Sequence, residues 1–486
     1  MILTRSQLIV ALAAAMLCLL AQLLAKTSSE VAALFSVAVF FGIMAVFAGG
    51  GVRTAFGCLN AILIGKLLLV GIVLKSLALQ PADGPLHAPQ TTGLVMAFGF
   101  AGLFAGTAVQ SRISCPQAFS MNQPFDLRLL LSFAILLFAA SYLGYFAALL
   151  PGANGQGIQT GGWLGIARAL GSLKSFAIVP PMLYLWRTQS RLWMTHPVIL
   201  GLLGWSALVG IFSTSKQDAM EPLLFYVLVG FMRYSLRDLR LWSLVSTGVL
   251  YYGIIVFPYA QYVRHSGGRE GTLLQRAEIT KDTFLRIATD GDFRTATTER
   301  VNEGVYFEQG ALSPFNRLAM VGEADKLISA TERTKAFTGW ETIIWGFKLV
   351  MPSFLMPDKP VFEAGNYLAH IVGEVAENDT TTQVSYGVMA NLYNAFSLAG
   401  VIIGTPIFFA AFYYWIRIFL GEPRWSGEPT TSALWFIWLV ASFQHSIVES
   451  TMSGLIATLS FPVVLALLYT GAKWFSLFLP QEVAYA

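Results

Sequence analysis

The sequence predicts an all-α polytopic membrane protein, and two features of its composition carry the prediction. Of its 486 residues, 55% are hydrophobic and only 12% are charged, about half the charged share of an average soluble domain. The apolar residues also gather into runs of roughly 20, the length that a helix needs to cross a bilayer. A disordered chain and an ordinary cytosolic enzyme are thereby excluded, and the net charge of +4 is too small to indicate a nucleic-acid partner.

Apolar runs bounded by charges or by Pro and Gly predict about twelve membrane spans. Nine of them precede a long polar stretch and three follow it. The expected spans lie near residues 7–25, 31–50, 54–79, 91–110, 129–150, 161–186, 194–213, 219–235, 240–258, 388–419, 432–449 and 453–476. Because Lys26 and Thr27 follow the first run without a small-residue cleavage pattern, we interpret that run as an uncleaved helix and not as a signal peptide.

The distribution of Lys and Arg among the short connections predicts the orientation. Alternate connections on one side carry twelve Lys or Arg residues, whereas the opposite connections carry only Lys26 and Lys216. Since cytoplasmic loops are enriched in Lys and Arg, both termini are expected in the cytoplasm, with an even number of spans. The chain then divides into an N-terminal bundle of about nine helices (residues 1–258), an extracytoplasmic loop (259–385) and about three C-terminal helices (386–486).

The extracytoplasmic loop is the most charged part of the chain, with 13 basic and 17 acidic residues. The spacing of its apolar residues predicts helices over 272–289 and over 313–330, the second with Val321 and Leu327 on the membrane surface. The apolar run 340–356 is too short for comfortable spanning and is predicted to be interfacial or re-entrant. Together these pieces indicate a lid over an outward-facing cavity.

Lys and Arg residues within predicted spans are candidates for function, because a charge there is costly unless it is paired or hydrated. Arg168 and Lys174 lie in the outer half of the sixth span with no acidic residue nearby in sequence, which suits a water-filled cavity that binds an anion. For Lys66, in the third span, a snorkelling or helix-paired lysine is the alternative to a functional one. Lys75, at the outer end of the same span, is interpreted as snorkelling to the interface.

A second set of candidates lies on the predicted outer side. Lys216 follows three hydroxyl residues, at 213–215, and precedes a helix expected to open at about Ala219, which suits a phosphate; a capped helix start with a snorkelling lysine is the alternative. Arg264 and Arg317 are further outer cations. His370, with Glu374 four residues later, is either a hydrogen-bonded structural histidine or a proton acceptor. No HExxH pattern and no Cys/His cluster occurs in the sequence, so neither a metal ion nor another cofactor is expected.

Residues 205–420 resemble the bacterial O-antigen polymerase and ligase superfamily in the order of several motifs. In that superfamily a Thr/Gly-Ser-Arg segment opens a span, and an arginine in the long outer loop precedes a Trp/Gly-containing amphipathic run, a Pro-rich turn, an Asn-x-Tyr segment and a Gly-containing span. The matching segments here are Ser213-Thr214-Ser215-Lys216, Arg317, the run from Gly339-Trp340, Pro357-Asp358-Lys359-Pro360, Asn391-Leu392-Tyr393 and Gly400 to Gly404.

Two positions depart from the family pattern. Lys216 stands where the family usually has Arg, which keeps the charge but loses the bidentate geometry. Ala390 precedes Asn391 where the ligase branch carries a His. The resemblance therefore favours the polymerase branch and leaves the proton acceptor unassigned.

The resemblance implies a multi-spanning, GT-C-like glycosyltransferase of the bacterial inner membrane. It would polymerise polyprenyl-pyrophosphate-linked oligosaccharide repeat units at the outer face, within the lipid bilayer and beside chain-length regulator and flippase partners. Lys216 and Arg317 would be the catalytic cations, and His370 the first candidate base, with His265 and Glu341 behind it. The other cations assigned to the pyrophosphate are Arg168, Lys174, Arg264 and Lys359.

A transporter or flippase is the main alternative. It would carry lipid-linked sugars or an organic anion and needs the same cationic cavity. Many transporters consist of two pseudo-symmetric halves, and no internal repeat is visible in this sequence. The sequence alone leaves both functions open.

Overall fold

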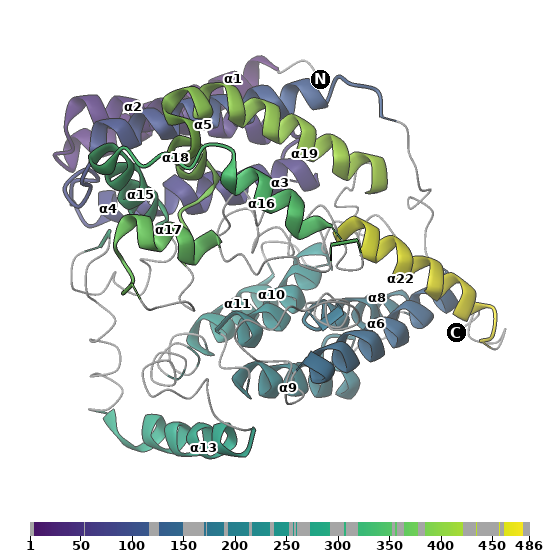
Figure 1. Cartoon of the computed structure of the whole chain (residues 1–486). Helices are drawn as coiled ribbons and strands as arrows, with labels where there is room; N and C mark the ends of the chain where they lie inside the picture. Colours follow the sequence, from purple (N-terminus) through teal and green to yellow (C-terminus); the bar gives the residue numbers. More distant parts are fainter. Residues whose placement is uncertain are drawn as a thin grey trace. The chain divides into compact units, whose positions relative to one another are not determined.

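The computed structural model is helical throughout the residues that it describes, among which no strand occurs (Figure 1). The described residues are 4–52, 54–115, 126–148, 170–171, 173–188, 193–212, 216–233, 238–251, 256, 259, 273–291, 306–307, 319–351, 355–356, 364–377, 384–420, 434, 456 and 461–479. For this part of the chain the all-α prediction is confirmed.

Six helical segments are long and apolar enough to cross a membrane, judged by length and composition. They are α1 (Arg5–Leu24), α2 (Ser29–Ala48), the continuous α3–η1–α4 (Ala55–Ile64, Gly65–Leu69 and Val70–Leu77), α5 (Pro89–Gln110), α6 (Leu127–Ala148) and α18–η5–α19 (Val388–Ala399, Gly400–Gly404 and Thr405–Leu420). Each coincides with a predicted span, so six of the predicted spans are confirmed as helices that could cross a membrane, as expected of a helical membrane protein.

The other predicted spans correspond to shorter helices or fall on residues that are not described. The shorter elements are η2 (Phe176–Ile178), α8 (Val179–Arg187), α9 (Pro197–Phe212), α10 (Lys216–Arg233), α11 (Leu239–Tyr251) and α22 (Phe461–Ser476). The run near 432–449 lies almost wholly outside the described residues. The total of twelve spans stays a prediction.

The long polar stretch contains four described helices. They are α13 (Leu273–Thr289), α15 (Val321–Thr334), α16 (Glu341–Val350) and α17 (Ala364–Val372). α13 confirms the helix predicted over 272–289. α15 covers the second half of the helix predicted over 313–330, but the placement of Val321 and Leu327 on the membrane surface is wrong. Both are fully buried, because α15 packs against α5, α17 and α18 and covers its apolar face with protein instead of lipid.

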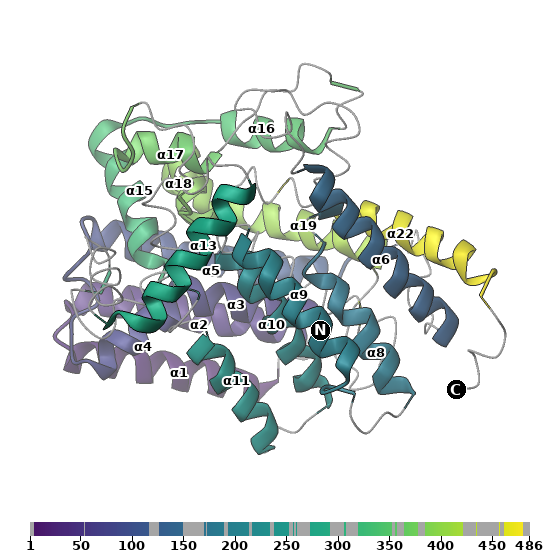
Figure 2. The same ribbon diagram turned by 90° about the horizontal axis from the view of Figure 1, so that it is seen from below.

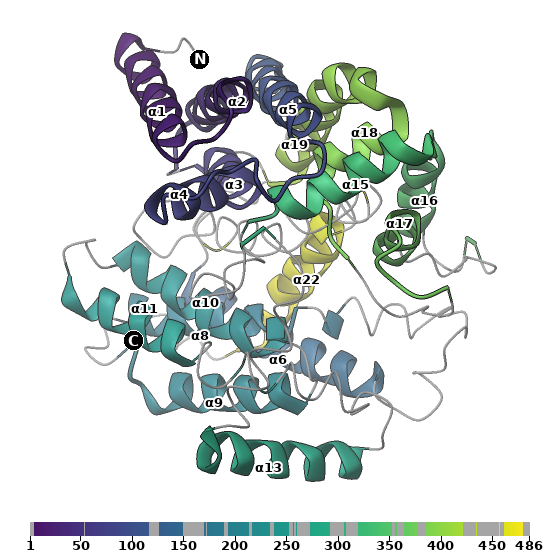
Figure 3. The same cartoon turned by 90° about the vertical axis from the view of Figure 1, so that its left-hand side faces the viewer.

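The described helices group into two compact units. Unit 1 comprises residues 1–121, 304–424 and 442–464, and unit 2 comprises 122–303, 425–441 and 465–486. The helices are seen from two further sides in Figures 2 and 3. The units do not follow the three segments expected from topology, because packing groups the first spans with helices of the polar stretch and with α18–α19.

Helix α5 is the centre of unit 1, where it packs between α2 and α19 (Figure 3). Its Gly102 and Gly106 have the spacing that allows two membrane helices to approach closely. A Cβ atom on Gly106 would lie 2.6 Å from the carbonyl oxygen of Pro406 and 3.0 Å from the nitrogen of Ala410. Here the backbone of α19 occupies the space that any side chain would need.

A buried polar contact holds four of these helices together. The Asn60 Nδ2 of α3 donates to the carbonyl oxygen of Ala45 at 2.9 Å and to Thr107 Oγ1 at 3.2 Å. The hydroxyl of Tyr413 in α19 donates to Asn60 Oδ1 at 2.6 Å. Because both ends of the Asn60 amide are satisfied, α2, α3, α5 and α19 are linked without leaving this side chain unpaired in an apolar layer.

We expect Gly106→Ala to lower the free energy of unfolding by about 1–3 kcal/mol, the usual cost of forcing atoms into a packed interior. The atoms in the way belong to the backbone of α19 and have no rotamer to change. Gly65→Ala is the control, since nothing lies within 4 Å of its added Cβ, and it should be neutral or slightly stabilising. Thermal unfolding of purified protein in detergent measures both; equal melting temperatures would contradict the close approach.

Candidate functional site

The structure describes the side chains of only two of the seven predicted site residues, Lys174 and His370. Lys216 is the first residue of α10, so the helix begins earlier than the start expected near Ala219; the Lys216 side chain is not described. The predictions for Arg168, Arg264, Arg317 and Lys359, and for the second candidate base His265, fall outside the described residues. Convergence of the cations on one pyrophosphate therefore stays a prediction.

Lys174 lies in unit 2, in the turn that precedes η2, and its side chain is buried with 9% exposed. Its Nζ lies 4.7 Å from the centre of the Tyr145 ring on α6. An aromatic face attracts a cation and offsets part of the cost of removing it from water. This contact is a structural reason to bury Lys174 and requires no anion, so the residue has a role in packing whether or not it binds pyrophosphate.

The interpretation of Lys75 as a snorkelling lysine is wrong. Its side chain is only 2% exposed, with Nζ 5.4 Å from the ring centre of Tyr306 and 5.8 Å from that of Phe307. The same Nζ donates to Gln80 Oε1 at 3.1 Å. Two aromatic residues of the polar stretch cover the end of α4. The sequence of the span alone cannot predict this contact, because Tyr306 and Phe307 lie more than 200 residues further along the chain.

Lys66 lies in the π-helical turn η1 in the middle of its span. Its carbonyl oxygen accepts a hydrogen bond from the nitrogen of Met320, at 3.0 Å, one residue before α15 begins. A π turn displaces backbone groups from the regular helical pattern, which makes such turns frequent at functional positions. In this protein the widened turn joins the third span to the polar stretch through the backbone of Lys66.

Glu374, four residues after His370 in sequence, lies beyond the end of the helix that carries His370. Helix α17 ends at Val372, and Gly373, with φ of +82°, turns the chain, as a glycine after a helix C-terminus commonly does. The Glu374 carboxylate instead accepts hydrogen bonds from Lys326 at 2.5 Å and from the hydroxyl of Tyr386 at 2.6 Å. His370 itself is half-buried on α17.

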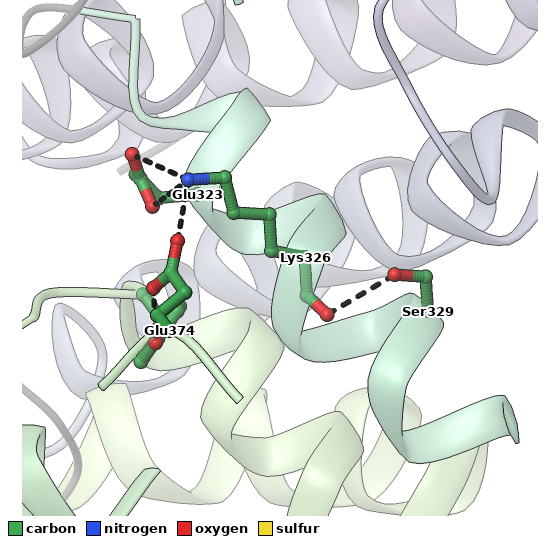
Figure 4. Close-up of polar contacts among 5 residues, drawn as sticks. Glu323, Lys326, Ser329 and Glu374 are labelled. Carbon is green, nitrogen blue, oxygen red and sulfur yellow. Dashed lines mark hydrogen bonds and ion pairs between the residues drawn. The ribbon is translucent and has the colours of Figure 1, made fainter. Parts of the chain in front are cut away.

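Lys326 of α15 is the centre of an acidic cluster (Figure 4). Its Nζ lies 3.2 Å from Glu323 of the same helix and 2.5 Å from Glu374. Burial lowers the pKa of Lys326, but the two carboxylates outweigh burial and raise it above the ordinary value. Burial and the hydrogen bond to Glu374 likewise raise the pKa of Tyr386. At neutral pH the cluster therefore holds a charged lysine and a protonated tyrosine between two carboxylates.

We expect Lys326→Met to lower the free energy of unfolding by about 2 kcal/mol, between the cost of losing an exposed and a buried ion pair. The change leaves two carboxylates, each about one-fifth exposed, facing one another without a cation. Because the pKa of Lys326 is raised, its contribution is complete below about pH 10.5, its unfolded value, and is lost only above that. The loss on mutation should thus be constant between pH 6 and 9.

Arg333→Met is the matched control for Lys326→Met, because Arg333 is an exposed cation on the same helix. Melting temperatures in detergent at pH 6, 7.5 and 9 measure both variants. If Lys326→Met were no less stable than Arg333→Met, the cluster would carry no net stabilisation.

Two further glutamates of the same segment accept hydrogen bonds from tyrosines. The hydroxyl of Tyr367 donates to Glu341 Oε2 at 2.9 Å, and burial together with this carboxylate raises the pKa of Tyr367 to about 12. Glu332 accepts from Thr91 at 2.7 Å and from Tyr393 at 3.3 Å. Of these two glutamates, Glu341 is exposed and Glu332 is half-buried, so the Glu341 carboxylate is the one that solvent reaches.

The start of the run from Gly339-Trp340 is hydrogen-bonded to the two residues that follow the Asn391-Leu392-Tyr393 segment. The nitrogens of Thr338 and Gly339 donate to the carbonyl oxygens of Asn394 and Ala395, at 3.2 and 3.1 Å. The Thr338 hydroxyl also donates to Asn394 Oδ1 at 2.9 Å, across 56 residues of sequence. The run that begins at Gly339-Trp340 and the helix that contains 391–393 therefore form one hydrogen-bonded assembly.

Metal ligands do not gather in the described part of the chain, where no three His, Cys, Asp or Glu side chains lie close enough together to hold an ion. Comparison of the chain with protein-family models, with curated proteins and with solved structures finds no match in any of the three. The likeness to the polymerase and ligase superfamily thus depends on the motifs quoted from the sequence.

Proposed function

We propose that the protein is a polysaccharide polymerase of the bacterial cytoplasmic membrane. In this proposal it has about twelve spans, a GT-C-like architecture, cytoplasmic termini and a long outer loop, and it joins polyprenyl-pyrophosphate-linked oligosaccharide repeat units into a surface or secreted polysaccharide. The observation that supports it best is the contact of Thr338 and Gly339 with Asn394 and Ala395. Segments that the resemblance relates only by their order along the chain meet in space, as parts of one site would.

The proposed reaction is metal-independent glycosyl transfer. A hydroxyl of one lipid-linked repeat unit attacks the anomeric carbon of a chain held on a second carrier, the bond from that carbon to the pyrophosphate oxygen breaks, and the pyrophosphate leaves with the electron pair. Pyrophosphate is a weak base, so stabilising its developing charge matters more than protonating it. Cations held in place before the reaction provide that stabilisation.

The residue roles follow from this chemistry. Lys216 and Arg317 stabilise the leaving group, and Arg168, Lys174, Arg264 and Lys359 bind the pyrophosphate. His370 is the first candidate to take the proton of the attacking hydroxyl. His265 and Glu341 stand behind it, and the exposure of Glu341 and its hydrogen bond to Tyr367 suit a carboxylate that receives a sugar hydroxyl.

A transporter or flippase for lipid-linked sugars or an organic anion is the second candidate, and one observation favours it. The segment α18–η5–α19 is interrupted at Phe396 (φ −141°, ψ 23°) and Ser397 (φ 58°, ψ −157°). Interrupted membrane helices are typical of transporters, where the freed backbone groups line a substrate site. In this chain the carbonyls of Asn394 and Ala395 are already paired with the polar stretch, which weakens that interpretation.

One experiment separates the two functions. Purified protein in liposomes is given lipid-linked repeat units, and the products are examined both for chain length and for the leaflet in which the lipid resides. A ladder of longer glycans is expected. Redistribution of the lipid between leaflets with no ladder would support the transporter instead of the polymerase. If neither a ladder nor redistribution were observed, both functions would be rejected.

A further inference from the structure

Helix α16 carries an apolar face that no described part of the protein covers. The exposed apolar side chains along it and at its ends are Trp340 (65% exposed), Ile344 (49%), Phe347 (57%) and Met351 (44%). Their spacing of four, three and four residues places them on one side of the helix. Thr342 and Gly346, on the other side, are buried. We call the first set the exposed face of α16.

The start of α16 is fixed to the interruption inside α18, at Phe396 and Ser397. The residues just before α16 pair with the last two carbonyls that precede Phe396, as described above. The ring of Trp340 also meets that of Phe396 edge to face, with 5.0 Å between the ring centres. α16 therefore begins at the level of the interruption, whatever path the chain takes after Val350.

The exposure of the interrupted span changes at the same point. Before it, the residues from Val388 to Ala395 are all buried in unit 1, whereas after it Ile402, Ile403 and Ile407 are 44–64% exposed. η5 and α19 contain 5 and 16 residues, which at about 1.5 Å per residue extend about 30 Å, the thickness of the hydrocarbon layer. The interruption thus lies at one edge of that layer.

From this edge α16 runs in the same general direction as α19, as Figures 1 and 2 both show. Its course leads into the apolar layer instead of along its surface. Glu341 stays at the edge, where it pairs with Tyr367. Lys348, in the last turn, places its Nζ 4.7 Å from the ring centre of Trp345, and both its aliphatic stem and this aromatic contact ease the entry of a cation into the layer.

We propose that α16 is a re-entrant half-helix whose exposed face contacts lipid acyl chains in the leaflet next to the long polar segment. The pairing of Thr338 and Gly339 with the interrupted span is the anchor that fixes where it enters. We assign bilayer lipid as the contact of this face, because it is apolar and exposed, like the neighbouring surface formed by Ile402, Ile403 and Ile407. A helix of 10 residues is also too short to cross the bilayer, so it must enter and leave on one side. The proposal does not depend on the glycosyl-transfer chemistry.

Spin labels on single cysteines test the proposal in lipid nanodiscs. Cys18, Cys58 and Cys115 are first replaced by Ala, and labels are then placed at Ile344, Phe347 and Met351. Collision rates with oxygen, which partitions into lipid, and with a water-soluble nickel chelate report the surroundings of each label. Ile403 is the lipid-facing reference, and Arg333, exposed on α15, is the aqueous reference.

We expect the oxygen-to-nickel ratio at all three positions to exceed that at Arg333 several-fold and to rise from Ile344 to Met351, because the helix deepens along its length. Ratios like that of Arg333 would place α16 in water and overturn the proposal. Low rates with both reagents would mean that protein covers the face, and a ratio that does not rise along the helix would mean that α16 lies flat on the surface. Either result would also reject a re-entrant helix.

Discussion

Asp325→Asn is expected to lower the free energy of unfolding by about 3–5 kcal/mol, the range for breaking a buried charged contact. The Asp325 side chain on α15 is 1% exposed. Its Oδ2 accepts from the nitrogen of His87 at 2.6 Å, and its Oδ1 accepts from the nitrogen of Ala88 at 3.0 Å and from Thr92 Oγ1 at 2.8 Å. In Asn one carboxylate oxygen is replaced by an NH2 group. Both oxygens of Asp325 accept hydrogen bonds, so in either orientation of the amide this NH2 group would face the N–H of His87 or of Ala88.

The charge of Asp325 matters as well as its shape. Ala88 is the N-cap residue immediately before α5, and the free N–H groups of a helix N-terminus favour a negative charge. Asp325 therefore fixes α15, from the polar stretch, to the start of a membrane helix. Its loss should loosen the contact between α15 and α5 before the rest of unit 1 is affected.

Asp83→Asn is the matched control for Asp325→Asn. Asp83 accepts a single hydrogen bond at a helix start, from the nitrogen of Ser28 at 2.9 Å, and it is partly exposed. Its replacement should cost about 1 kcal/mol, as for an ordinary helix cap. Thermal unfolding in detergent, or survival of protein in membranes during heating, compares the two. An Asp325→Asn variant as stable as Asp83→Asn would show that the buried carboxylate is not the anchor described.

The parts of the fold that the sequence predicts are those that depend on local composition. Six spans and α13 follow from runs and periodicity over about 20 residues, because an apolar run of that length has few alternatives in a membrane. The spacing of Gly102 and Gly106 is also visible in the sequence as a sign of close helix contact. It does not reveal the partner, which is the backbone of α19 about 300 residues later.

Contacts between distant segments account for what the sequence does not predict. The amphipathic pattern of α15 fits a lipid surface and a protein surface equally well, and only α5, α17 and α18 decide the outcome. Lys75 has the position of a snorkelling lysine until Tyr306 and Phe307 cover it. His370 and Glu374 have helical spacing in the sequence, yet Gly373 ends the helix between them. The Gly373-Glu374 dipeptide was the sign, visible in the sequence, that the helix ends before Glu374.

Replacing Arg317 or Lys216 by Ala is expected to abolish a detectable glycan ladder while the protein stays folded in the membrane. Removing one group that stabilises developing charge usually lowers a rate by about 10²–10³, enough to stop chain growth that requires many successive transfers. Lys216→Arg should retain the ladder, because it keeps the charge and restores the residue typical of the resembling family. Lys281→Ala, an exposed lysine of α13, should not change it.

The double variant Arg317→Ala/Lys216→Ala tests whether the two cations act on one pyrophosphate. Groups that stabilise the same leaving group act as a unit, so their losses are far from additive. We expect single-turnover transfer by the double variant to be slowed hardly more than by the more severe single variant. Rates that fall by the full product of the two single effects would mean independent roles. Strong coupling would support one pyrophosphate that both cations contact, whereas independence would remove the shared pyrophosphate from the mechanism.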